Sequence, residues 1–177
     1  MRFLQYEELI LDTKNQSLLR QTQDRLKNGN AKNPISVVVE SKNQGGFQTK
    51  VSIRDHVLIS DQPRGFSGLD KGPKPSELVL AALAACQETT YRIFAEDMGI
   101  EIDKIAVELK GTQDLKGFMA LDRNVPAGFC KIEGQVFIQS PANASDLEIL
   151  KQQVDRHCPV LDDLKRPVDV TFTVKKI

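Results

Sequence analysis

Hydrophobic and polar positions divide the chain into a polar beginning and a strongly patterned remainder. Residues 1–33 are polar with scattered leucines that would share one helix face, and the sequence NGN ends that helix. From Ile35 the spacing becomes that of strands, in the runs ISVVVE, FQTKVSI and HVLIS. We therefore expect a helical N-terminal extension over residues 1–33. A domain over residues 34–177 should follow and begin with a β-hairpin or a three-stranded meander.

The longest helix is predicted in the middle of the chain. Residues 76–98 contain no Gly or Pro, Pro75 stands immediately before them, and Gly99 ends them. Residues 78–86 are apolar on every side of this helix. Because one small sheet covers only one side of such a helix, we expect a second helix and a second copy of the chain to cover the rest.

Two further strands and a second helix are predicted after the long helix. The alternating runs KIAVELK and KIEGQVFIQ are typical of strands. Ser145 and Glu148 have the spacing of a capping box, and the apolar face of the helix that follows includes Cys158. Pro159 must end that helix, so the short helix PVLDDLK should follow, and the alternating run PVDVTFTVKKI should form a half-buried strand. Together these elements predict an α+β fold.

Composition and charge exclude several classes of partner. The 24 Lys and Arg residues balance the 24 Asp and Glu residues, so neither nucleic acid nor an anionic membrane is an expected partner. No apolar run has the length of a membrane span, and Glu7, Glu8 and Asp12 interrupt any signal-peptide core. Three cysteines without a CxxC motif favour a reducing compartment. We therefore expect a cytoplasmic protein in which each cysteine is a candidate for chemistry.

The three cysteines differ in their sequence surroundings. Cys86 lies about ten residues into the long helix, where a buried thiol is commonly inert. Cys158 lies between one helix end and the next helix start, where backbone N–H groups and the helix dipole favour a thiolate. Cys130 enters a strand beside Lys131, and we expect it to be structural. Local sequence alone thus ranks Cys158 as the more acidic thiol.

Metal and nucleotide sites are weakly indicated. His56 and His157 are the only histidines, and neither has a metal-ligand spacing with Cys86 or Cys130. The Gly-rich loop before the long helix contains neither GxGxxG nor GxxxxGK. We therefore expect neither a metal nor an organic cofactor.

Two segments resemble those of a known family. The stretch GPKPSELVLAALAACQETTYR, with HCPVLDDLKRPVDV further along, is similar to the osmotically inducible protein C (OsmC) and organic hydroperoxide resistance (Ohr) family. That family carries a Gly/Pro-rich loop, an Ala-rich run ending in the reactive cysteine, and a second Cys-Pro on another helix. The resemblance extends from about Ile35 to the C-terminus. It implies an OsmC-like fold in an intertwined homodimer, with the central helices of both subunits between sheets.

The resemblance also implies roles for two cysteines. Carried over by motif, Cys86 is the peroxidatic residue and Cys158 is the resolving residue, which reverses the ranking from local sequence. The family lowers the pKa of its reactive cysteine with an arginine from an N-terminal loop, and a glutamate at the start of the cysteine's helix steadies that arginine.

This sequence departs from the family pattern at the charged positions. Ser76 stands where well-known members have the glutamate, and Glu77 follows one place later, about 100° around the helix. The turn sequence GGFQ lacks the expected arginine, so Arg54 on the following strand and Arg64 in the loop before the helix are the candidates. The chain is therefore closer to the OsmC-like branches than to the Ohr branch.

The resemblance implies a thiol peroxidase that serves in defence against oxidative stress. The Cys86 thiolate would attack a hydroperoxide, its sulfenic acid would form a disulfide with Cys158, and a dithiol reductant, small or lipoyl-type, would restore both thiols. Apolar residues expected at the site suit an organic hydroperoxide: Leu78, Leu83, Phe66, and Phe118 or Phe129. The alternative is an OsmC-fold protein without efficient peroxidase activity that binds an apolar ligand or acts as a thiol redox sensor.

Overall fold

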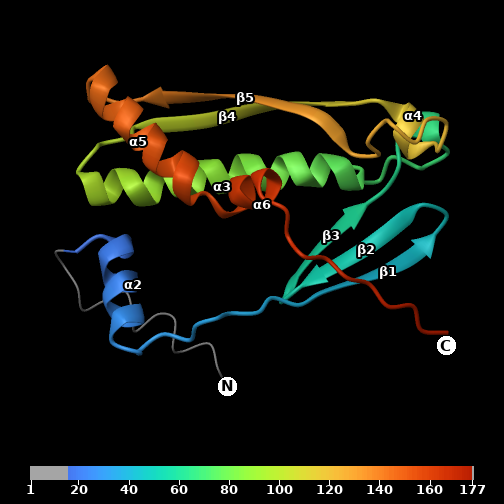
Figure 1. The fold of residues 1–177 in the computed structure, drawn as a ribbon, viewed down its shortest axis with the longest axis horizontal. Helices are drawn as coiled ribbons and strands as arrows, with labels where there is room; N and C mark the ends of the chain where they lie inside the picture. The colour runs from blue at the N-terminus through green and yellow to red at the C-terminus, as the bar shows by residue number, and fades with distance from the viewer. Residues whose placement is uncertain (1–15, 177) are drawn as a thin grey trace.

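The computed structural model describes residues 16–176, which have an α+β fold (Figure 1). The elements, in chain order, are α2 (Leu18–Lys27), β1 (Val39–Gly45), β2 (Gln48–Ile53), β3 (His56–Ser60), η2 (Arg64–Phe66), α3 (Pro75–Met98), β4 (Lys104–Gln113), α4 (Leu115–Phe118), β5 (Phe129–Gln139), α5 (Ala144–His157) and α6 (Pro159–Lys165). The described residues form two antiparallel sheets, a three-stranded sheet in the order β1-β2-β3 and a β4-β5 pair.

Helix α2 lies where the leucine spacing predicts a helix. Its capping residue, Ser17, accepts the backbone N–H of Arg20 at 3.3 Å and donates its own hydroxyl to Asp97 of α3 at 2.6 Å. The Arg20 guanidinium binds the same carboxylate at 2.8 Å. These contacts lower the pKa of Asp97, the Ser17 hydrogen bond most strongly. They tie part of the predicted extension to the long helix, whereas residues 1–15 of that extension lie outside the described residues.

The predicted three-stranded meander is confirmed, with a later start. Strand β1 begins at Val39, four residues after the predicted start at Ile35, because Val39 is the first residue with a partner opposite it, Ile53 of β2. The turn between β1 and β2 lies at the predicted glycines, and Gly45 and Gly46 have φ values of 112° and 52°. Such values favour glycine because other side chains rarely adopt them.

A buried carboxylate organises the Gly/Pro-rich loop between β3 and α3. Asp61 is 1% exposed and accepts the backbone N–H groups of Gln62, Leu69 and Lys71 at 2.8, 3.1 and 3.2 Å. Gly68 has no room for a side chain, since a Cβ atom there would lie 1.8 Å from a Gln62 carbonyl oxygen. The loop therefore has one defined path, which delivers the chain to the start of α3.

The long central helix is confirmed at the predicted position. Pro75 is its first residue, Glu77 accepts the backbone N–H of Lys74 at 3.0 Å, and Gly99 ends it with a φ of 67°. Helix α3 runs along the β4-β5 pair, and α5 crosses α3 and packs against it (Figure 1). None of the described helices combines the length and apolarity needed to cross a bilayer. The buried apolar residues form one cluster: Leu83, Tyr91, Ala95, Leu150, Val154 and Cys158.

Helices α5 and α6 follow the predicted order, with one correction at the first cap. The predicted capping box of Ser145 and Glu148 is wrong, because Asn143 caps α5 and its side chain accepts the Asp146 N–H at 2.9 Å. Pro159 ends α5 and begins α6, as predicted. Cys158 therefore lies between the two helices, as the last cap of one and the first cap of the next.

The strand predicted at the end of the chain is wrong for the single chain. Residues 167–176 have no regular secondary structure, and Phe172 and Val174 are 92% and 98% exposed. A strand needs a neighbour to satisfy its backbone groups. None of the described strands of the same chain pairs with this segment.

The buried carboxylate of the loop gives the first testable prediction. Asp61→Asn should lower the free energy of unfolding by about 2 kcal/mol, because the amide loses the negative charge and its NH2 group cannot accept the backbone N–H groups that one of the carboxylate oxygens accepts. Urea denaturation followed by circular dichroism measures the change. Asp70→Asn, at an exposed position of the same loop, is the matched control. Equal denaturation midpoints for the two variants would contradict the structural role of Asp61.

Candidate active site

The structure brings two of the three cysteines together. Cys158 is fully buried, Cys86 is half-buried, and the Cys158 thiol donates to the Cys86 sulfur across 3.3 Å. Both thiols are free. Since a disulfide has a length of about 2.05 Å, only a small movement of either side chain is needed to reach bonding distance, and a two-electron oxidant would then be required to form the bond.

The two thiols meet because apolar faces of α3 and α5 pack together. Leu150 and Val154 lie two turns and one turn before Cys158 on α5, and all three are fully buried. Leu83 of α3 belongs to the same cluster, and Cys86 lies one turn beyond it. The spacing of apolar residues on both helices therefore determines which residues face each other. It places one thiol on each side of the contact between α3 and the end of α5.

Burial is the main influence on the Cys86 thiol and raises its pKa above the ordinary value. The neighbouring Cys158 thiol also raises it, whereas the backbone N–H of Val160 and the side chain of Thr90 lower it. The net effect is a raised pKa. Within one chain Cys86 is therefore mainly a neutral thiol at pH 7, and a nearby cation is needed to make it a strong nucleophile.

Val160 and Thr90 interact with Cys86, and the sequence analysis predicts neither interaction. The N–H of Val160, in the first turn of α6, acts on Cys86, although sequence placed this helix start beside Cys158. Only the packing of α6 against α3 reveals this contact. The Thr90 hydroxyl donates to the Cys86 carbonyl oxygen at 2.7 Å, and its spacing of four residues was a signal present in the sequence.

The predicted charged residues lie away from the thiol pair in the single chain. Arg54 is exposed at the turn between β2 and β3, and Arg64 is exposed at the start of η2. Glu77 caps the start of α3 through Lys74. Within residues 16–176 no arginine is among the groups that shift the Cys86 pKa. The roles of these three residues stay predictions.

The apolar residues predicted around Cys86 do not all lie together. Leu83 and Phe129 line one cavity beside α3. Phe66 and Phe118 are exposed on other elements, and Leu78 is half-buried near the start of α3.

The remaining candidate residues have structural contacts. The Cys130 thiol is exposed and donates to the carbonyl oxygen of Thr112 on β4 at 3.1 Å. The His157 ring stacks on Phe94 with ring centres 4.9 Å apart. Among the described residues, no group of three or more His, Cys, Asp or Glu side chains could hold a metal ion.

Comparison with known families places the chain in one of them. Residues 68–173, more than half of the chain, match the family model described as OsmC-like protein. The protein therefore belongs to the OsmC-like family. No match is found among curated protein sequences.

Solved structures confirm the fold. An OsmC-like protein from Mycoplasma pneumoniae has a TM-score of 0.66 at 19% identity, over 75% of this chain and 89% of that chain. An organic hydroperoxide resistance protein OsmC from Legionella pneumophila has a TM-score of 0.56 at 20% identity, over 78% and 95%. The organic hydroperoxide resistance protein OhrB of Bacillus subtilis has a TM-score of 0.50 at 22% identity, over 76% and 94%. Identities this low establish the shared fold.

The short distance between the two sulfurs predicts one specific disulfide. Mild peroxide treatment followed by peptide mapping should recover a Cys86–Cys158 linkage and a free Cys130, because only the first two thiols face each other. Cys130→Ser should form the same linkage at the same rate. A linkage that includes Cys130 would contradict this assignment.

Proposed function

We propose that this protein is a thiol peroxidase that reduces organic hydroperoxides, with Cys86 as the nucleophile and Cys158 as the resolving cysteine. The observation that carries the proposal is the 3.3 Å contact between the two sulfurs at the centre of the fold. Membership of the OsmC-like family supports it, because similar folds include proteins described as organic hydroperoxide resistance proteins. Protection of the cell against oxidative stress would be the outcome.

The proposed reaction transfers two electrons from the thiols to the peroxide. The Cys86 thiolate attacks the distal peroxide oxygen, an S–O bond forms, the O–O bond breaks, and the alkoxide takes a proton and leaves as an alcohol. The Cys158 sulfur then attacks the sulfenic sulfur of Cys86, so that an S–S bond forms and water leaves. An external dithiol reduces this disulfide and is itself oxidised, which returns the enzyme to its starting state.

The active form would be a homodimer. Ala81, Ala82 and Ala85 are exposed on α3 in the single chain, and their small side chains permit the close approach of another helix. The exposed apolar residues at the end of the chain also lack a cover: Val168, Val170, Phe172 and Val174. A second copy would cover these surfaces. Arg54 or Arg64 of one copy could then lie next to Cys86 of the other.

The alternative is that the protein is a member of this family that does not turn over hydroperoxides efficiently. The raised pKa of Cys86 and the exposed positions of Arg54 and Arg64 favour it, since no activating cation acts on the thiol among the described residues of one chain. The thiol pair would then act as a redox sensor, or the protein would bind an apolar ligand. Turnover measurements separate these functions.

Activity assays with cysteine variants test the peroxidase. Purified protein with a dithiol should consume an organic hydroperoxide faster than hydrogen peroxide, and Cys86→Ser should abolish turnover because the nucleophile is gone. Cys158→Ser should react once, leave a sulfenic acid that a thiol reagent traps, and cycle poorly. Cys130→Ser is the matched control and should keep wild-type activity.

The same assay identifies the activating cation. Removing that cation raises the pKa of Cys86, so the pH profile of the first step should move to higher pH in Arg54→Ala or in Arg64→Ala. The products should not change. If wild type and Cys86→Ser consume hydroperoxide equally slowly, the peroxidase function fails and the alternative takes its place.

Ultracentrifugation at micromolar concentration tests the homodimer. Wild-type protein should sediment as a dimer, and Ala85→Glu should lose the dimer because it adds a charge to the exposed face of α3. Ala127→Glu, at an exposed loop position, should remain a dimer. A folded wild-type monomer would overturn the proposal.

A further inference from the structure

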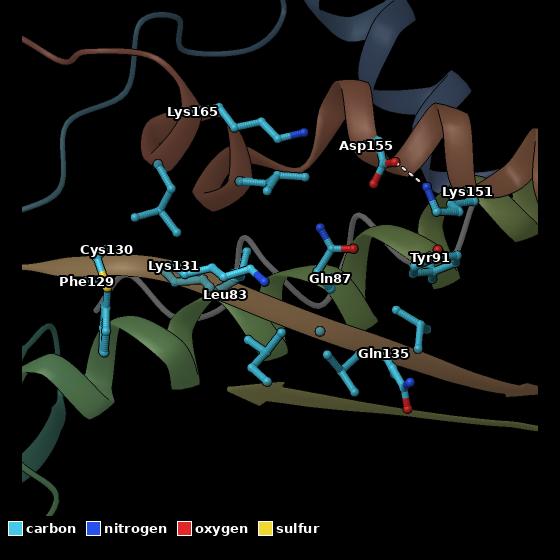
Figure 2. A pocket seen from close by; sticks show the side chains of 17 residues that line it. Leu83, Gln87, Tyr91, Phe129, Cys130, Lys131, Gln135, Lys151, Asp155 and Lys165 are labelled. Atoms are coloured by element: carbon cyan, nitrogen blue, oxygen red, sulfur yellow. Dashed lines mark hydrogen bonds and ion pairs between the residues drawn. The ribbon is translucent and has the colours of Figure 1, made fainter. Parts of the chain in front are cut away.

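A cavity of about 510 Å³ lies between α3, the β4-β5 pair and the helices α5 and α6 (Figure 2). Its volume is within the range of small-molecule sites in proteins. Neither Cys86 nor Cys158 lines it, so it is separate from the thiol pair. Cys130 lies at one end of the cavity, and the ion pair of Lys151 and Asp155 lies at the other (Figure 2).

Much of the cavity wall is apolar. The side chains come from four elements, so that the helices and the sheet both contribute to it: Leu83, Val107, Leu109, Ile132, Val136 and Leu161. Such a wall favours a hydrocarbon chain, since burying apolar surface is worth about 25 cal/mol per Å².

Two buried polar side chains of α3 face this cavity. Gln87 is 7% exposed and Tyr91 is 3% exposed, and neither side chain hydrogen-bonds to another described residue. Every fully enclosed side-chain N or O atom in residues 16–176 has a partner, so the unpaired polar ends of Gln87 and Tyr91 are not fully enclosed, and both residues line the cavity. Figure 2 shows the Gln87 amide projecting from α3 into the space beneath α5 and α6. The Gln87 amide is therefore available to hydrogen-bond a ligand in the cavity in place of water.

The lysines that line the cavity differ in whether they already form an ion pair. Lys151 binds Asp155 at 2.6 Å, and Lys131 binds Glu133 at 2.6 Å. Lys165, in the last turn of α6, makes no ion pair with another of the described residues, and its side chain extends over the cavity (Figure 2). Lys165 is therefore the lysine of the wall that is available to an anion.

We propose that this cavity binds a small carboxylic acid with a hydrocarbon chain. The carboxylate lies between the Lys165 ammonium and the Gln87 amide, both of which donate to it, and the chain lies on the apolar wall. A carboxylate fits because it accepts from both groups, whereas a neutral alcohol offers no charge to Lys165. The inference goes beyond the proposed peroxidase, since binding requires no thiol chemistry.

Calorimetric titration of the reduced full-length protein with decanoate tests the site. Decanoate should bind saturably, and decanol, which has the same chain length, should bind more weakly. Lys165→Gln should weaken decanoate binding about threefold to fivefold, as the loss of a solvent-exposed ion pair predicts, and leave decanol binding unchanged. Lys116→Gln, at an exposed lysine outside the cavity, is the matched control and should behave as wild type.

Alkylation of Cys130 locates the bound acid. Decanoate should slow the reaction of iodoacetamide with Cys130, measured by peptide mapping, because this thiol lies at one end of the cavity. Absence of saturable decanoate binding, or equal decanoate affinity in wild type and Lys165→Gln, would overturn the proposal. Cys86→Ser should bind decanoate as wild type does, so a failure of the peroxidase function and a failure of this site give different results.

Discussion

The packing of α3 against α5 and the start of α6 is the contact on which the rest of the site depends. It encloses Leu150, Val154 and Cys158 completely, and it places the Cys158 thiol 3.3 Å from Cys86. The same burial that joins the thiols also raises the pKa of Cys86, since a thiolate is poorly solvated there. The packing of these helices therefore brings the two thiols into contact and, within a single chain, disfavours the thiolate form of Cys86.

Much of the fold could be predicted because its signals are local. The run without Gly or Pro between Pro75 and Gly99 determines α3, and Pro159 forces the break between α5 and α6. The cysteine pair is predicted by the family resemblance, whereas local sequence alone ranks Cys158 as the more acidic thiol. In the structure the helix start next to Cys158 in sequence directs the Val160 N–H to Cys86, a contact between distant segments that sequence neighbours do not reveal.

The features that sequence could not predict depend on contacts between distant segments. The alternation at the end of the chain predicts a strand, yet a strand exists only where another strand pairs with it, and Phe172 remains exposed in the single chain. Strand β1 begins at Val39 for the same reason, because its pairing with Ile53 decides where the ladder starts. Arg54 lies in the meander and Arg64 in the loop that follows it. In the single chain these segments do not pack against the helices that hold Cys86 and Cys158.

Helix α6 contacts both the thiol pair and the cavity. It begins directly after Cys158, its first turn supplies the Val160 N–H to Cys86, and its later residues Leu161 and Lys165 line the cavity. Seven residues are too few to form a stable helix alone, so α6 holds its shape through these contacts. One short helix therefore contributes residues to both places, its first turn to the surroundings of Cys86 and its later residues to the cavity, although neither Cys86 nor Cys158 lines the cavity.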